Sequence, residues 1–289
     1  MADRARLATL KQTLLREVRY LCCHTERRWN TPIVKTLEDI RSVGSRAVFF
    51  GGTLRSLLLS RLFNRRPGRP RDLDIVVAGT TLEEMKRKFD AHITRETRFG
   101  GLSMKRYTWQ FDVWPLDRTW TFVQSDAFNP QFSALPRTTF LNLEAVAVDV
   151  WPGDQRKRTI YSGDEQFFSG ILNKTLEINN AVNPFPGLCV VRSLVMAADI
   201  DFSIGPRLAH YIAHHGDNLV QDELGDIQRH HYGRVRIDPG QLRMWINHVT
   251  DSLGRQADRP VLLPIPRQLT LWDEDTVAVR LHVLAGRRK

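Results

Sequence analysis

The sequence has few cysteines and no long hydrophobic run. Of its 289 residues 3 are cysteines (Cys22, Cys23 and Cys189), and none of their spacings is C-x-x-C. Neither a disulfide framework nor a cysteine-rich zinc site is therefore supported. No run of about 18 apolar residues occurs, and charges interrupt each apolar stretch before Cys22, so the apolar core of a signal peptide is absent. We expect a cytoplasmic protein in a reducing compartment, with no membrane partner.

Acidic residues are in the minority, with 32 Asp and Glu against 42 Lys and Arg, for a net charge of +10. The electrostatic field of this net positive charge favours a polyanionic partner such as RNA, or a phosphate-rich substrate. A solvated basic surface would give the same count. Hydrophobic residues make up 42% of the chain and charged residues 26%. These fractions are typical of a chain that buries a core rather than of a disordered one.

Changes of hydrophobic period divide the chain into three regions. We expect N-terminal helices over 1–45, an α+β domain over 46–165 and a helical region over 166–289. Apolar residues at three- and four-residue spacing predict helices in the first and third regions, and two more in the second. The predicted helices cover 5–23, 34–43, 54–63, 81–89, 188–198, 206–215 and 241–253.

The middle region also predicts a small mixed β-sheet flanked by helices. Its apolar and β-branched runs end at glycine and proline turns, a pattern typical of strands. The sheet is expected to end near Tyr161. The predicted strands cover 47–50, 73–77, 102–108, 110–116 and 143–150.

Two carboxylates lie at the start of the second predicted strand, Asp72 immediately before it and Asp74 within it. Side chains alternate along a strand, so Asp72 and Asp74 share one face while Leu73 and Ile75 share the other. Two like charges on one face repel unless a cation lies between them, and Mg²⁺ prefers such oxygen ligands. A solvated strand end is the alternative interpretation.

A third carboxylate, Asp112, lies among apolar neighbours in another predicted strand. An isolated charge in such a setting needs a partner. If this strand lies beside the strand of Asp72 and Asp74, the three carboxylates line one cleft. They would then form a ligand set for two metal ions and for in-line phosphoryl transfer.

A glycine pair, Gly51 and Gly52, stands between a predicted strand and a predicted helix. Without side chains the backbone can approach a ligand closely, and the start of the helix favours phosphate. Arg55, one turn into this helix, would reach the same anion. A plain turn is the alternative.

These segments resemble the signature elements of the polymerase β-like nucleotidyltransferase superfamily. The matching segments are Phe50–Arg55, Asp72–Ile75 and Phe111–Val113. More narrowly, the chain is similar to the head and neck domains of bacterial poly(A) polymerases and class II CCA-adding tRNA nucleotidyltransferases. Leu143–Asp149 resembles the strand after the third carboxylate, and Leu188–Ala198 resembles the neck helix.

The resemblance implies an α+β head domain, a helical neck and Mg²⁺-dependent transfer of a nucleoside monophosphate. The donor would be an NTP, and the acceptor a hydroxyl group, in the first place an RNA 3′ end. Asp72, Asp74 and Asp112 would hold the metal ions, and Asp112 would also act on the acceptor hydroxyl. The implied nucleotide-binding residues are Gly51, Gly52, Thr53, Arg55 and Arg192.

The chain departs from this family at three places. Ser56 follows Arg55, where the family has an Arg-Asp pair. Phe185–Cys189 stands where CCA-adding enzymes carry the Glu-Asp-x-x-Arg template that selects C and A, and Thr138–Asn142 replaces a second family motif. The base-selecting device is therefore absent, and we expect the broader reaction class rather than CCA addition.

Two other functions stay open on the sequence. The acceptor could be a protein or a small molecule, as for nucleotidylating toxins and antibiotic-modifying enzymes. Alternatively, a degenerate head domain could bind a nucleotide or RNA without catalysis. Five arginines between the glycine pair and Asp72 could bind phosphates or form a solvated loop. They are Arg61, Arg65, Arg66, Arg69 and Arg71.

Overall fold

The computed structural model describes most of the chain, which divides into two units. The described residues are 2–23, 31–63, 70, 72–97, 99–124, 129–153 and 157–265. The first unit holds the described residues up to Thr138, together with Glu144–Glu165. The second unit holds Thr139–Leu143 and the described residues from Gln166 onward. None of the described helices has the length and apolar character that a membrane crossing requires.

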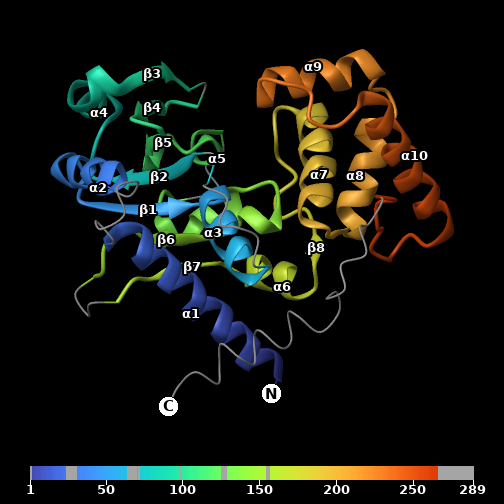
Figure 1. Ribbon diagram of the computed structural model, residues 1–289, viewed down its shortest axis with the longest axis horizontal. Coiled ribbons are helices and arrows are strands. Elements are labelled where there is room, and N and C mark those ends of the chain that lie inside the picture. Colours follow the sequence, from blue (N-terminus) through green and yellow to red (C-terminus); the bar gives the residue numbers. More distant parts are fainter. Residues whose placement is uncertain are drawn as a thin grey trace. The chain divides into compact units, whose positions relative to one another are not determined.

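The first unit contains a seven-stranded sheet with the strand order β3-β4-β5-β2-β1-β6-β7 (Figure 1). Neighbouring strands pair antiparallel, except that β2 and β5 pair parallel. The strands are β1 (Arg46–Phe50), β2 (Leu73–Ala78), β3 (Ile93–Glu96), β4 (Leu102–Arg106), β5 (Trp109–Pro115), β6 (Ala147–Asp149) and β7 (Ile160–Tyr161).

Helices of the first unit bury apolar stripes. On the first of them, Leu10, Leu14 and Val18 are buried at four-residue spacing, which aligns them on one face. This helix, α1, contacts α3, while α2 contacts α4 and α3 contacts β1 and β2. The N-terminal helices are therefore part of the first unit. The four helices are α1 (Ala2–Cys23), α2 (Thr31–Val43), α3 (Gly52–Leu62) and α4 (Leu82–Phe89).

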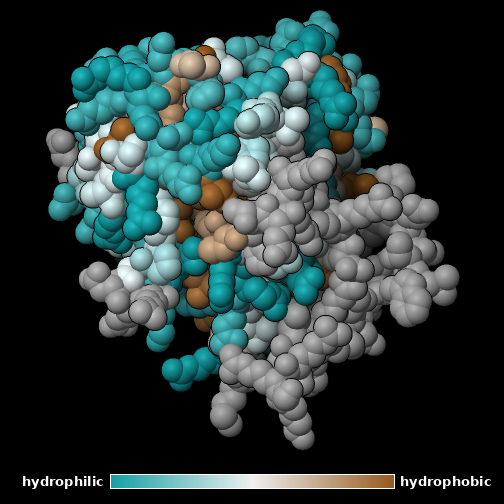
Figure 2. Space-filling view, turned by 60° about the vertical axis from the view of Figure 1, so that its left-hand side comes forward, coloured by the Kyte–Doolittle hydropathy of each residue, from teal (hydrophilic) through white to brown (hydrophobic). Residues whose placement is uncertain are grey.

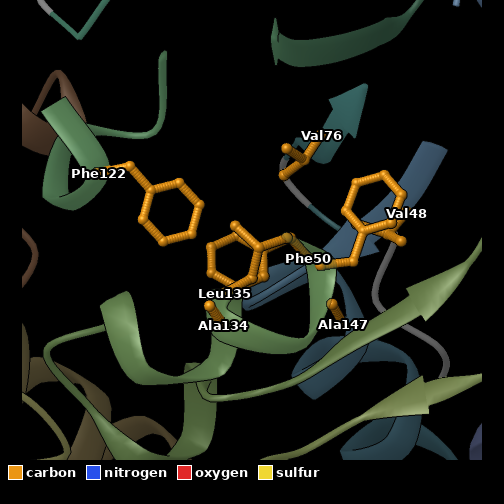
Figure 3. Close-up of a cluster of buried hydrophobic side chains, with 8 residues drawn as sticks. Val48, Phe50, Val76, Phe122, Ala134, Leu135 and Ala147 are labelled. Atoms are coloured by element: carbon orange, nitrogen blue, oxygen red, sulfur yellow. The ribbon is translucent and has the colours of Figure 1, made fainter. Parts of the chain in front are cut away.

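A hydrophobic cluster joins strands β1, β2 and β6 to the segment after β5 (Figure 3). That segment contains α5 (Trp120–Gln124) and a 3₁₀ helix, η3 (Phe132–Thr138). Trp114 and Leu116 pack against the cluster as partly buried neighbours. The cluster consists of Val48, Phe50, Val76, Phe122, Phe132, Ala134, Leu135 and Ala147.

The second unit is mainly helical. Helix α7 contacts α8 and α9, and α10 contacts the same two helices; α7, α8 and α10 run side by side in Figure 1. A short parallel pair joins β8 (Thr175–Leu176) to β9 (Ser203–Ile204). The helices are α6 (Gln166–Leu172), α7 (Pro186–Ile200), α8 (Pro206–Gly216), α9 (Gln221–Tyr232) and α10 (Pro239–Arg255).

This architecture confirms the predicted fold class, a small mixed sheet with flanking helices followed by a helical C-terminal region. The predicted adjacency of the two carboxylate-bearing strands is also present, as β2 and β5. The predicted strand over 143–150 is wrong in its first half, because a 3₁₀ helix, η4 (Asn142–Glu144), precedes β6. There the Asn142 side-chain oxygen accepts hydrogen bonds from the backbone N–H groups of Leu143 and Glu177, each at 2.9 Å, which favours a local turn over strand pairing.

Two further differences lie at the edge of the sheet. The predicted strand over 102–108 ends early at Arg106, because Tyr107 adopts a left-handed φ of 55° in the turn between β4 and β5. Strand β3 was not expected, since three of its four residues are exposed and its sequence, Ile-Thr-Arg-Glu, has little apolar alternation.

Substitutions in the cluster around Leu135 should destabilise the protein far more than substitutions at exposed positions nearby. Leu135 is 0% exposed, whereas Val123 on the adjacent α5 is 55% exposed. We expect Leu135→Ala to lower the free energy of unfolding by about 2–5 kcal/mol and Val123→Ala to change it by less than about 0.5 kcal/mol. Urea unfolding followed by tryptophan fluorescence measures both values, and equal losses would contradict this packing.

Candidate active site

The parallel pairing of β2 with β5 sets Asp74 opposite Asp112 in register. Their chain neighbours Leu73, Ile75 and Phe111 are fully buried, whereas both aspartates are half-buried. Since side chains alternate along a strand, the two carboxylates share the face that these apolar residues do not occupy. Adjacent strands are about 4.8 Å apart, so the two acidic groups lie next to each other.

Ser103 on β4 is a partner of Asp112 that the sequence did not single out. The two residues pair across β4 and β5, and the Ser103 hydroxyl donates a hydrogen bond of 2.5 Å to Oδ1 of Asp112. Ser103 is 0% exposed. Its bond meets the need of Asp112 for a partner in an apolar strand. The sequence feature that could have pointed to Ser103 is its position as a serine within a predicted apolar strand.

Thr53 links the start of α3 to the backbone around Asp74. Its buried hydroxyl accepts a hydrogen bond of 2.9 Å from the Asp74 N–H and lies 3.4 Å from the Asp72 carbonyl oxygen. The predicted nucleotide-binding residue Thr53 therefore contacts the backbone of Asp74 in β2 and of Asp72 immediately before it.

The predicted glycine turn lies beside these residues. Gly51 has φ 58° and ψ −120°, a conformation that L side chains rarely adopt, and its N–H donates to the Val146 carbonyl at 3.0 Å. At Gly52 a Cβ atom would lie 3.6 Å from Oδ2 of Asp74 and 3.5 Å from Nη2 of Arg55. The Asp74 carboxylate and the Arg55 guanidinium thus both border the backbone of Gly52.

Arg55 forms an ion pair with Glu144, a residue the sequence did not mark as part of the site. Nη1 of Arg55 lies 2.9 Å from Oε1 of Glu144, and the two side chains are 19% and 12% exposed. A pair with this little exposure is screened less than a surface pair. Glu144 therefore fixes the guanidinium beside Gly52. The sequence feature that could have pointed to Glu144 is its position as an acidic residue within an apolar run.

The other predicted site residues are less closely placed. Asp72 is half-buried and immediately precedes β2, one register step beyond Leu73. Among the described residues, no group of three or more His, Cys, Asp or Glu side chains is arranged to hold a metal ion. The structure thus brings Asp74 and Asp112 together, and the role of Asp72 in a three-carboxylate set stays a prediction.

Arg192 lies on α7 in the second unit, and its nucleotide contact also stays a prediction. Of the arginines near the glycine turn, Arg61 lies 3.7 Å from Oε1 of Glu17 on α1. The other four lie outside the described residues, namely Arg65, Arg66, Arg69 and Arg71.

No protein-family model and no curated protein matches the sequence. Solved structures do match. A tRNA-processing enzyme in an apo form is 16% identical, with a TM-score of 0.49 over 76% of this chain and 56% of that chain. A tRNA nucleotidyltransferase complexed with a primer tRNA and an incoming ATP analog is 15% identical, with a TM-score of 0.48 over 72% of this chain and 58% of that chain.

A CCA-adding enzyme from Thermotoga maritima complexed with tRNA is 14% identical, with a TM-score of 0.40 over 88% of this chain and 67% of that chain. The chain spans little more than half the length of the first two structures. The tRNA nucleotidyltransferase and the CCA-adding enzyme are of the class that the sequence resemblance names. Because their TM-scores are below 0.5, the proposals below rest on this chain's own residues.

The two glycines of the turn should respond differently to substitution. Gly51→Ala forces a side chain into a positive-φ conformation outside the left-handed helical region, and it should lower the free energy of unfolding by about 1–3 kcal/mol. At Gly52 a methyl group meets only ordinary contacts, so Gly52→Ala should keep or raise stability by up to about 1 kcal/mol. The methyl group would nevertheless stand between a bound anion and Arg55.

We therefore expect Gly52→Ala to weaken NTP binding about tenfold, or ~1.4 kcal/mol, in a protein of undiminished stability. Thermal unfolding and equilibrium binding of a fluorescent NTP measure the two effects. Unchanged NTP affinity in Gly52→Ala would show that no nucleotide approaches this turn.

Proposed function

We propose that this protein is a nucleotidyltransferase that moves a nucleoside monophosphate from an NTP to a hydroxyl acceptor, the 3′ end of an RNA. The observation that carries the proposal is the register of Asp74 with Asp112, next to the glycine turn that opens α3. The turn offers backbone to a phosphate chain, and the carboxylates offer ligands and a base for the reacting oxygen.

Magnesium fits the chemistry of the carboxylate pair. Oxygen ligands are those that Mg²⁺ prefers, and the register of β2 with β5 places two carboxylates side by side on one face of the sheet. We propose that Asp74 and Asp112, with Asp72, hold the metal. When bound, it would activate the acceptor hydroxyl and stabilise the charge that develops on the leaving pyrophosphate.

The reaction assigns distinct tasks to residues of the first unit. The acceptor oxygen forms a bond to the α-phosphorus, the bond from that phosphorus to the bridging oxygen breaks, and pyrophosphate leaves. Asp112 accepts the proton of the acceptor hydroxyl, and the bond from Ser103 to Oδ1 fixes the orientation of its carboxylate. Thr53 holds the backbone of Asp74 at the start of α3.

The triphosphate would lie along the turn of Gly51 and Gly52. Arg55 would contact its oxygens, since the guanidinium already borders Gly52, and Glu144 orients that guanidinium. RNA as the acceptor is supported by the net charge of +10, which favours a polyanion. No base selection is assigned to these residues, because backbone and guanidinium contacts to phosphate carry no information on the base.

Removing either carboxylate of the pair should abolish transfer without unfolding the protein. We expect Asp74→Asn and Asp112→Asn each to lower NTP-dependent labelling of RNA by about 100-fold or more, because both lose ligand charge and Asp112→Asn also loses the proton acceptor. Asp117→Asn is the matched control, since Asp117 is exposed just after β5.

The assay supplies each labelled NTP with Mg²⁺ and a mixture of RNA and protein, and separates the products by class. The proposal is supported if the wild type and Asp117→Asn label RNA and the Asp74→Asn and Asp112→Asn variants do not. Label in protein or in small molecules would replace the RNA acceptor with another class. NTP binding without pyrophosphate release would identify a nucleotide-binding module instead.

A further inference from the structure

Basic side chains at the edge of the first unit's sheet differ in how they are paired. On α2, Asp39 accepts from Arg106 at 2.7 Å and from Lys88 at 3.2 Å. Burial of Asp39 opposes ionisation, but these two bonds hold the pKa of its carboxyl below the usual value. On α4, Lys86 lies 2.9 Å from Oε1 of Glu96. These cations are neutralised within the protein.

Lys105 and Arg95 are different. Both are exposed, and neither forms an ion pair or hydrogen bond with another described residue. Lys105 pairs across strands with Gln110, and Arg95 pairs with Ser103. Paired residues share a face, and so do residues two apart on one strand. Lys105 and Arg95 therefore share the sheet face of Asp112, with Ser103 between Arg95 and that carboxylate.

Strand geometry gives the scale of this surface. The pair of Lys105 and Gln110 lies two residues along the strands from Ser103 and Asp112, which is about 7 Å. Arg95 lies two strands from Asp112, or about 10 Å. Both cations are thus within one or two nucleotides of the predicted reacting centre.

The order of strands places these cations opposite the glycine turn. In the order β3-β4-β5-β2-β1, the turn follows β1 on one side of the aspartate pair, while Lys105 and Arg95 lie on β4 and β3 on the other side. In-line phosphoryl transfer requires the attacking and leaving oxygens on opposite sides of the phosphorus. If the triphosphate lies along the turn, the acceptor approaches over β4 and β3.

We propose that Lys105 and Arg95 bind the phosphodiester backbone of the acceptor RNA next to its 3′ end. This assignment rests on the proposed nucleotidyl transfer and names the part of the protein that holds the acceptor. Binding there is independent of base sequence, because the contacts are to phosphates. The described surface in Figure 2 is mostly hydrophilic.

The test is the salt dependence of RNA binding by the full chain. A fluorescent single-stranded RNA with a free 3′ hydroxyl is titrated without NTP at several salt concentrations. Each phosphate contact to a single strand contributes about 0.7 to the slope of log K against log salt. We expect the double variant Lys105→Gln/Arg95→Gln to lose about 1.4 of that slope and more than about tenfold in affinity near 0.1 M salt.

The matched control is the double variant Lys86→Gln/Lys88→Gln, which removes the same net charge from cations already paired with carboxylates. It should leave the salt slope within about 0.3 of the wild type. Equal slopes for the wild type and the Lys105/Arg95 variant would overturn the proposal, as would equal slope losses in both double variants.

A second arm separates the acceptor from the NTP. Binding of a fluorescent NTP should be unchanged in Lys105→Gln/Arg95→Gln, and a weaker NTP affinity with unchanged RNA affinity would assign these cations to the triphosphate and overturn the proposal. Pyrophosphate release by the wild type is measured in parallel. Release together with an unchanged RNA slope refutes the acceptor surface alone, whereas no release refutes the proposed transfer.

Discussion

Parallel pairing between β2 and β5 is the constraint on which the rest of the site depends. The register sets Asp74 beside Asp112, and a shift of one residue would turn one of the carboxylates into the apolar layer of Leu73 and Phe111. The buried neighbours on both strands therefore hold the acidic pair in place. Since a parallel pair needs a crossover connection, α4, β3 and β4 lie between these strands in the sequence. That connection also carries Lys105 and Arg95.

The surrounding contacts orient this acidic pair. Ser103 donates to Asp112, and the Thr53 hydroxyl accepts from the Asp74 backbone, so each aspartate is tied to a different neighbouring element. Arg55 brings a positive charge beside Gly52, and Glu144 fixes its direction. Such support is typical of sites whose geometry must persist while a charged ligand enters and leaves. Arg55 is oriented although Ser56 follows it, because the carboxylate that pairs with Arg55 is Glu144 of η4.

Local patterns were sufficient to predict the carboxylates, the glycine turn and most of the helices. Alternation around Asp74 and Asp112 marked each as a charge in an apolar strand, and the parallel pairing bears out their expected adjacency. Local patterns could not predict contacts between side chains that are distant in the sequence. Glu144 is 89 residues from Arg55, and Ser103 looks like an ordinary strand residue until β4 is placed beside β5. The edge strand β3 was missed because its exposed residues have no apolar alternation.

The most direct test of the account is whether Asp74 and Asp112 hold one divalent cation between them. Mn²⁺ can replace Mg²⁺ in a titration followed by electron paramagnetic resonance, with a non-cleavable NTP analogue present. The account predicts that Asp74→Asn and Asp112→Asn each weaken Mn²⁺ binding by at least about tenfold, and that the two losses are not additive because both residues serve one site. Mn²⁺ bound as tightly by both variants as by the wild type would contradict it.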